Sequence, residues 1–328
     1  MSSRLCISCV NTRVSLIGFD LERRVPFWFC PANVLRACGV CYDGEALWAA
    51  SDRQLTRIDG KGLSFVALPG PYPNYAHSIH RIDDGLFAVA DTGNSRVLLF
   101  DGSLFPLALS PIEEWGEAVP LDAIHVNDML PFADGFLVSA FSHQPFSRLK
   151  KKNLPWAKWK LGTLFYLSRE HETTIARIAA SGIACPHSLT RFRDDIFCCS
   201  SASGDFLHFV RERDYSLRLS ECIHVTDTHF VRGALRLSDM WVLGGSCPRH
   251  KSEGGGMALY LVHDGGEIEQ IVLDITGEIY DILPWEPAMV AISETLLKAP
   301  SLSPGNGIAE DVLSGDFPPR CACPEEYR

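Results

Sequence analysis

The sequence predicts an all-β fold, a six-bladed β-propeller closed by strands from both ends of the chain. Short β-branched and aromatic runs alternate with turns rich in Gly, Asp, Asn and Pro, and almost no stretch has sustained helical periodicity. A short strand, an acidic or Gly-containing turn and an apolar strand recur six times. The copies start 39 to 60 positions apart, close to the roughly 40 to 50 residues of a four-stranded blade.

The six copies divide the chain into blades. They begin at Cys38, His77, Asn127, His187, Arg232 and Tyr280. Most continue into a third strand, as at 95–101 and 205–210. The last copy has no strands beyond about Ile292, whereas the N-terminus supplies unpaired strands at 4–9 and 13–20. If these complete the sixth blade, the ring closes and loses its open edges. We expect a propeller over residues 1–297 and a tail rich in Pro, Ser and Gly over 298–328.

Composition limits the function classes. A chain of 328 residues with 46% hydrophobic content can bury a large core. Its net charge of −10 disfavours nucleic-acid binding, which needs a dominant basic surface. No apolar run approaches the roughly 20 residues of a membrane span, and the first residues lack a signal-peptide pattern. We therefore expect a cytoplasmic protein that binds neither nucleic acid nor membrane.

The cysteines are interpreted as reduced thiols, because most of the 12 lie in strand-like segments. Cys6/Cys9 and Cys38/Cys41 have C-x-x-C spacing, but positions three apart in a strand face opposite sides and do not readily share a metal ion. Cys321 and Cys323, in the tail, are equally poor candidates.

Two segments resemble a known family. Residues 185–206, CPHSLTRFRDDIFCCSSASGDF, and 230–249, FVRGALRLSDMWVLGGSCPR, are similar to the P-H-S…G-x-G and F-x-R-G…G-x-S-x-P-R signatures of an uncharacterised bacterial family, domain of unknown function 4915. The resemblance covers residues 75–281. Cys198 and Cys199 stand where that family has a tryptophan-rich second strand. DTGNSR at 91–96 also resembles the NHL-type propeller repeat. These resemblances imply a propeller and little about activity.

The candidate site lies at the start of the innermost strands, which line the central channel of a propeller. The first residues of the copies, His77, Asn127, His187, Arg232 and Tyr280, form a polar ring there, joined by His125 and Glu278 from positions two residues earlier. Positions two residues deeper are all apolar and are expected to plug the channel: Val40, Ile79, Met129, Leu189, Ala234 and Ile282. A polar ring above an apolar floor suits a small-molecule pocket. The polar groups could instead satisfy one another and ordered water.

Chemical roles can be assigned within this ring. Tyr280 with His77 or His187 could supply acid and base, and Arg232 needs either a carboxylate, Glu278 or Asp281, or a ligand anion. The histidines of three adjacent blades could hold zinc or a similar divalent ion: His77, His125 and His187. Asp91 either points to the same face or bonds its own turn.

Two insertions, 143–162 and 247–256, are basic and partly aromatic and are expected on the same face, with Arg249 as a ligand-binding residue. They favour an anionic, carbohydrate- or phosphate-like metabolite. No glycine loop for a nucleotide cofactor is present. We expect a lyase, isomerase or hydrolase; the alternative is a non-catalytic module that docks a protein partner through these loops.

Overall fold

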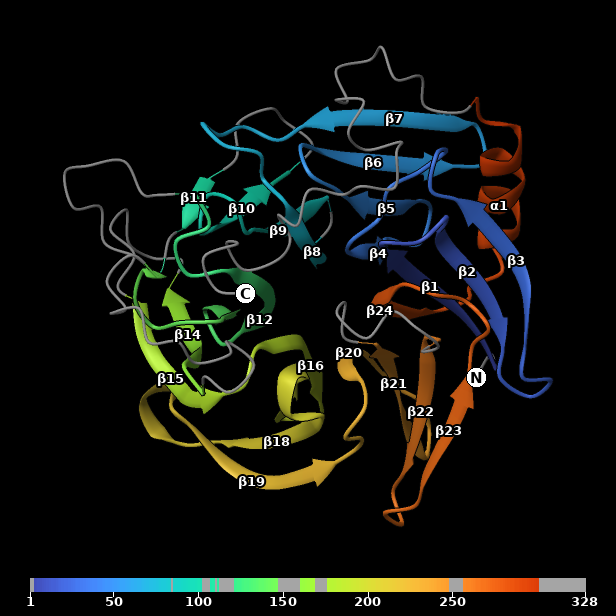
Figure 1. The fold of residues 1–328 in the computed structure, drawn as a ribbon. Helices are drawn as coiled ribbons and strands as arrows, with labels where there is room; N and C mark the ends of the chain where they lie inside the picture. Colours follow the sequence, from blue (N-terminus) through green and yellow to red (C-terminus); the bar gives the residue numbers. More distant parts are fainter. Residues whose placement is uncertain are drawn as a thin grey trace.

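The computed structural model describes residues 3–83, 85–101, 107–109, 111, 121–146, 160–168, 176–247 and 256–300. Six four-stranded antiparallel sheets surround a central axis (Figure 1). The predicted six-bladed propeller is therefore confirmed.

Five blades are built from four consecutive strands, with the first strand of each innermost. Blade one is β4 (Val40–Tyr42), β5 (Leu47–Ala50), β6 (Gln54–Asp59) and β7 (Gly62–Ala67). Blade two is β8 (Ala76–Asp83), β9 (Leu86–Asp91), β10 (Arg96–Phe100) and β11 (Leu107–Leu109). Blade three is β12 (Val126–Phe132), β13 (Gly135–Ala140), β14 (Gly162–Ser168) and β15 (Ala176–Ile183). Blade four is β16 (Pro186–Phe192), β17 (Asp195–Ser200), β18 (Asp205–Arg211) and β19 (Leu217–His224), with 3-10 turns η3 (Ser201–Ser203) and η4 (Arg213–Tyr215). Blade five is β20 (Phe230–Arg236), β21 (Met240–Ser246), β22 (Ala258–His263) and β23 (Ile268–Val272).

The sixth blade joins the two ends of the chain. Its inner strand is β24 (Glu278–Pro284), which pairs with β1 (Arg4–Val10); β2 (Val14–Asp20) and β3 (Val25–Pro31) complete the sheet. The expected closure is thus observed, with β3 as a strand that the sequence pattern did not single out. Antiparallel pairing of β24 with β1 satisfies backbone groups that would otherwise be open edges.

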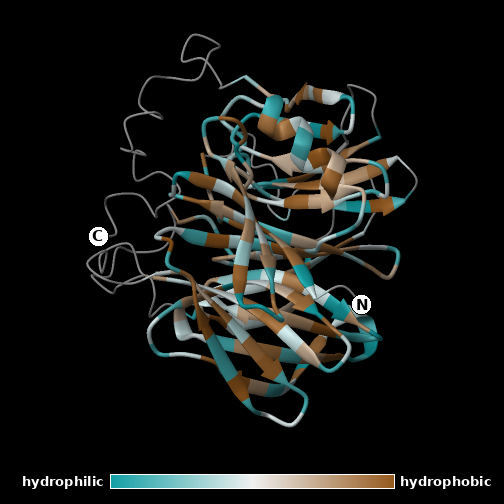
Figure 2. Ribbon diagram, turned by 90° about the vertical axis from the view of Figure 1, so that its right-hand side faces the viewer, coloured by the Kyte–Doolittle hydropathy of each residue, from teal (hydrophilic) through white to brown (hydrophobic). Residues whose placement is uncertain are grey.

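Hydrophobic clusters between neighbouring blades hold the ring together. The described residues form six such clusters, one for each pair of adjacent sheets. Between blades two and three, for example, Val97 packs with Val126 and Phe136. Hydrophobic residues follow the strands, whereas many turns are hydrophilic (Figure 2). The core of the protein is therefore a ring of inter-blade contacts around the channel.

One helix, α1 (Met289–Lys298), follows the last blade and contacts β3, β6 and β7 (Figure 1). Its residues Met289, Ile292 and Leu296 are buried in the cluster that contains Trp285. Their spacing of three and four gives a short apolar stripe, which was missed because ten residues are too few for a strong periodic signal. No helix in the described ranges is long and apolar enough to cross a membrane. The cytoplasmic location stays a prediction.

Candidate functional site

A β-bulge interrupts the inner strand of five blades at the candidate site. The pairing register of the inner strand shifts within Ala76–Ile79, Val126–Asp128, His187–Thr190 and Arg232–Ala234. In β24 it shifts between Ile279 and Asp281, the partners of Cys9 and Ser8. A bulge adds one residue to the strand and breaks the alternation of its side chains. Consequently the residue after each ring position also faces the channel region.

The predicted ring residues come together as a hydrogen-bonded chain. His77 Nδ1 lies 2.7 Å from Asn127 Oδ1, and Asn127 Nδ2 lies 2.8 Å from His187 Nε2. His187 Nδ1 lies 3.0 Å from the carbonyl oxygen of Cys185 and 2.8 Å from Ser201 Oγ. A carbonyl oxygen only accepts, so His187 carries its proton on Nδ1 and accepts at Nε2. This fixes the Asn127 amide and makes His77 Nδ1 a donor.

The ring is buried instead of lying at an open mouth. His77, Asn127, His187, Arg232 and Tyr280 are at most 8% exposed. Burial and the charge of Arg232 lower the pKa of His187 well below its usual value, so its ring is neutral, as the hydrogen bonds require. Many of the polar groups of the ring are hydrogen-bonded to one another. This arrangement was one of the two alternatives considered from the sequence.

Arg232 is paired with a carboxylate. Its Nη1 donates to Glu278 Oε2 at 2.6 Å, and the second oxygen of Glu278 accepts from Asn11. The guanidinium also lies 4.9 Å from the ring centroid of Tyr280, which in turn makes an edge contact with His77 at 5.3 Å. Of the two partners considered for Arg232, Glu278 is the one observed, and Asp281 is not.

Asp91 and His125 serve local structure. Asp91 is fully buried and bonded to Arg96, Asn94 and Asn74 at 2.8 to 2.9 Å. Burial raises its pKa, and the bonds from Asn94 and Arg96 oppose that shift. His125 Nδ1 lies 2.9 Å from Asp122 Oδ2. Both side chains therefore order the connections that lead into the channel strands.

The three histidines do not share a coordination point. The amide of Asn127 stands between His77 and His187, and the rings of His77 and His125 meet edge to face at 5.1 Å. Within the described ranges, no group of three or more His, Cys, Asp or Glu side chains is arranged to hold a metal ion.

The residues expected to plug the channel do not fill it: five of the six, Val40, Ile79, Leu189, Ala234 and Ile282, line a cavity along it. Each of the following is at most 3% exposed and belongs to an inter-blade cluster: Val40, Ile79, Met129, Leu189 and Ile282. This cavity has a volume of about 360 Å³. It extends from His77, Asn127 and His187 to Thr190, Pro284 and Glu286 near the far ends of the inner strands.

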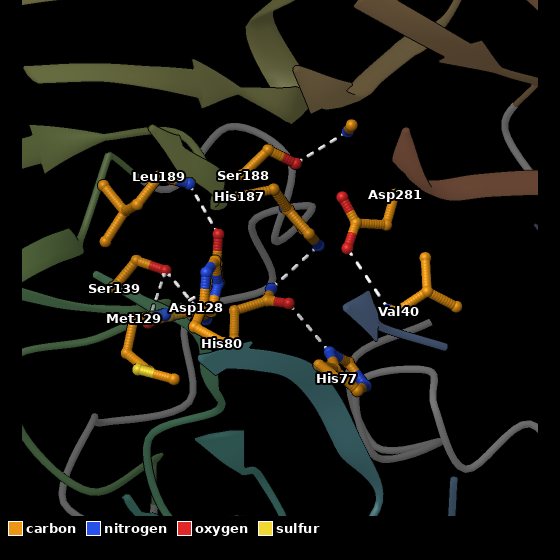
Figure 3. Close-up of polar contacts among 12 residues, drawn as sticks. Val40, His77, His80, Asp128, Met129, Ser139, His187, Ser188, Leu189 and Asp281 are labelled. Atoms are coloured by element: carbon orange, nitrogen blue, oxygen red, sulfur yellow. Dashed lines mark hydrogen bonds and ion pairs between the residues drawn. The ribbon is translucent and has the colours of Figure 1, made fainter. Parts of the chain in front are cut away.

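An Asp–His pair lines this cavity. Asp128 Oδ1 lies 2.9 Å from His80 Nε2 and 2.8 Å from the backbone nitrogen of Met129, and Asp128 Oδ2 accepts from the nitrogen of Leu189 at 2.6 Å (Figure 3). Burial lowers the pKa of His80, but the charge of Asp128, the hydrogen bond to it and the charge of Asp281 outweigh this and raise it. The side chain of His80 is 29% exposed, so the ring is accessible from the cavity.

Asp281 faces this pair from across the channel (Figure 3). Its blade lies three places from that of Asp128 in a ring of six. It accepts from the backbone nitrogens of Ile282 at 2.9 Å and Val40 at 3.3 Å. Burial raises its pKa to about 6; the charge of His80 opposes the shift and that of Asp128 adds to it.

Sequence reasoning missed the inner layer to which Asp128 and Asp281 belong. The positions one residue after the copy starts contain only small or acidic residues: Gly39, Ser78, Asp128, Ser188, Gly233 and Asp281. That restriction was the available signal. The signal was overlooked because side chains in a regular strand alternate between its two faces. Without a bulge, the side chains at these positions would face away from the channel. Ser188 also accepts a hydrogen bond from the nitrogen of Gly233 at 2.6 Å, which links two blades.

The described cysteines are reduced, whereas most of the two insertions lie outside the described residues. The ten described cysteines are free thiols, and Cys6 and Cys9 belong to different inter-blade clusters, as expected for opposite sides of a strand. Cys321 and Cys323 lie outside the described residues. So do Arg249 and most of both insertions, 143–162 and 247–256, and their roles stay predictions.

Similar solved structures agree with the fold. No protein-family model and no curated protein matches the sequence significantly. The β-propeller domain of Cps50 (Swd1) from Myceliophteria thermophila is 12% identical, with a TM-score of 0.54 over 85% of this chain and 86% of that one. A streptogramin B lyase is 8% identical, with a TM-score of 0.51 over 83% and 84%. A protein of unknown function from Bacteroides caccae is 12% identical, with a TM-score of 0.51 over 86% and 98%. At such identities the likeness concerns the fold alone.

Proposed function

We propose that this protein is an enzyme that acts on a small polar molecule by proton transfer in the channel cavity, with His80 as the general base or acid and Asp128 as its positioning residue. The observation that carries the proposal is the Asp128–His80 pair on the cavity wall. A volume of about 360 Å³ is near the lower end of ligand pockets, roughly 300–1,000 Å³, and suits a small metabolite.

The hydrogen bonds of Asp128 define the reactive atom. An ionised carboxylate only accepts, and Asp128 accepts from His80 and from two backbone nitrogens. His80 therefore holds its proton on Nε2, and the lone pair of the neutral ring is on Nδ1. A proton taken from the substrate by Nδ1 yields an imidazolium that the charge of Asp128 stabilises.

The predicted ring has a supporting role in this proposal. His77, Asn127, His187 and Tyr280 form the inner wall of the cavity and orient one another. Arg232 is not among the residues that line it, and Glu278 neutralises its charge. The proposal therefore assigns no anion site to Arg232, and no metal ion to His77, His125 and His187. Membership of the domain of unknown function 4915 family stays part of the proposal.

The test is proton exchange. Pooled small polar metabolites are incubated with the protein in D₂O, and NMR monitors their consumption or deuterium uptake. His80→Gln should lower the rate about 10²-fold or more, the usual contribution of general acid–base catalysis.

A matched control is His224→Gln, because His224 also pairs with a carboxylate, Asp205 at 2.8 Å, but is 53% exposed on the outer side of its blade. This variant should keep the wild-type rate. A fully active His80→Gln variant, or a wild-type protein that exchanges and consumes nothing, would contradict the proposal.

A further inference from the structure

Across the cavity from Asp128, the wall contains a second carboxylate, that of Asp281. Asp281 lines the cavity, and within the described part of the chain the structure records no ion pair for it. Neither lysine nor arginine is among the described residues that line the cavity, which also include Glu286. The positive charge that acts most strongly on Asp281 is that of His80. The ring of His80, however, is already hydrogen-bonded to Asp128.

Ser78 is an independent sign of a missing partner. The residue is 6% exposed and lines the cavity, and its buried hydroxyl oxygen has no hydrogen-bond partner among the described residues. Buried hydroxyls are normally bonded, because an unmade bond leaves the desolvation cost uncompensated.

The backbone brings Ser78 and Asp281 close around the channel. A Cβ atom on Gly39 would lie 2.5 Å from the Cα atom of Ser78, so the two inner strands almost touch there. The next residue, Val40, donates its backbone N–H to Asp281. One blade therefore separates the hydroxyl from the carboxylate.

We infer that the cavity recognises a ligand with a positively charged, N–H-bearing group, such as an aminated metabolite, which is held by Asp281, across the channel from Asp128, and by Ser78, two residues before His80 in the same strand. This inference rests on the proposed function for the identity of the ligand cavity. An ammonium group offers three donors, and Asp281 and Ser78 both retain acceptor capacity. A buried carboxylate gains most from such a partner, because its own ionisation is unfavourable without one.

The same charges argue against an anionic ligand. A carboxylate or phosphate placed in the cavity would face Asp281, Asp128 and Glu286 with no arginine or lysine of the described lining to offset them. The anionic metabolite expected from the sequence rested on Arg232 and on the basic insertions, and Arg232 is committed to Glu278.

The test compares three sugars of one size that differ in charge: glucosamine, glucose and glucuronate. Binding to the full-length protein is measured at pH 7 by ligand-observed NMR and calorimetry. Glucosamine should bind at least about tenfold more tightly than glucose, since a hydrogen bond to a charged group contributes about 1.5–3 kcal/mol, and glucuronate should bind most weakly.

Substitutions test which residues cause the preference for glucosamine. Asp281→Asn should remove the preference for glucosamine, and Ser78→Ala should weaken its binding while leaving folding intact, because that hydroxyl has no partner to lose. Asp274→Asn, at an exposed position, is the matched control and should behave as the wild type.

Equal binding of the three sugars, tighter binding of glucuronate, no binding at millimolar concentration, or a preference that survives Asp281→Asn would each overturn the inference. His80→Gln should keep the glucosamine preference while losing proton transfer. A failed catalytic proposal is thereby distinguished from a failed ligand assignment.

Discussion

Asp281 should make the folded protein less stable as the pH rises, and Asp281→Asn should remove this dependence. The pKa of this carboxyl is raised from its usual 3.8 to about 6, first of all by burial. Each pKa unit corresponds to about 1.4 kcal/mol, so ionisation costs the folded state about 3 kcal/mol. Because the folded pKa is the higher one, the stabilising contribution is complete below the unfolded value and is lost as the pH rises through 6.

The measurement is urea unfolding of the wild type and Asp281→Asn at pH 4.5 and pH 8. The stability of the variant relative to the wild type should increase by about 2 kcal/mol between these conditions, since part of the cost is already present at pH 4.5. Asparagine also loses an acceptor for a backbone N–H, but that loss does not depend on pH. Asp274→Asn, which changes an exposed carboxyl, should give a constant difference. A pH-independent difference for Asp281→Asn would refute the reasoning.

Four further outcomes follow from the described contacts. Arg232→Met should cost about 3–5 kcal/mol in denaturant unfolding because it removes the guanidinium that neutralises the buried Glu278 carboxylate, and Glu278→Gln in the same chain should recover part of that loss, which additive effects would contradict. Asp128→Asn should move the acid limb of the pH–rate profile to lower pH, since this carboxylate raises the pKa of His80; an unmoved limb would exclude His80 as the titrating group. Gly39→Ala should lower the melting temperature, because its Cβ would lie 2.7 Å from a carbonyl oxygen, and an unchanged value would show that the inner strands can separate there. Trp285→Ala should cost about 3–5 kcal/mol through the cavity that it leaves, and a loss below 1 kcal/mol would mean that α1 collapses to fill it.

The buried polar groups along the axis of this propeller reduce the stability of the folded state, and the hydrophobic contacts between the blades offset that loss. The inter-blade clusters consist of buried hydrophobic residues, whereas the channel contains buried carboxylates and histidines that destabilise the folded state when unpaired. Such polar groups are usually found where function requires them. The contrast supports the channel as the functional part of this protein.

The number of blades, the closure and the polar ring were determined by the sequence itself. Six copies of one strand pair must form six equivalent sheets, and unpaired strands at both ends must pair to remove open edges. Equivalent positions in the copies then occupy equivalent places around the axis. For this reason His77, Asn127, His187, Arg232 and Tyr280 could be grouped from their order alone, although they lie far apart in the chain.

The tertiary structure alone decided what these residues do and where the accessible surface lies. The bulges in the inner strands bring Ser78, Asp128 and Asp281 to the wall of the channel cavity, beside the cluster residues Ile79 and Ile282. A bulge depends on how two strands pair, and a strict two-residue alternation in one strand cannot reveal it. Partner choice is also decided by the tertiary structure: Arg232 meets Glu278 because the inner strands β20 and β24 lie side by side in adjacent blades.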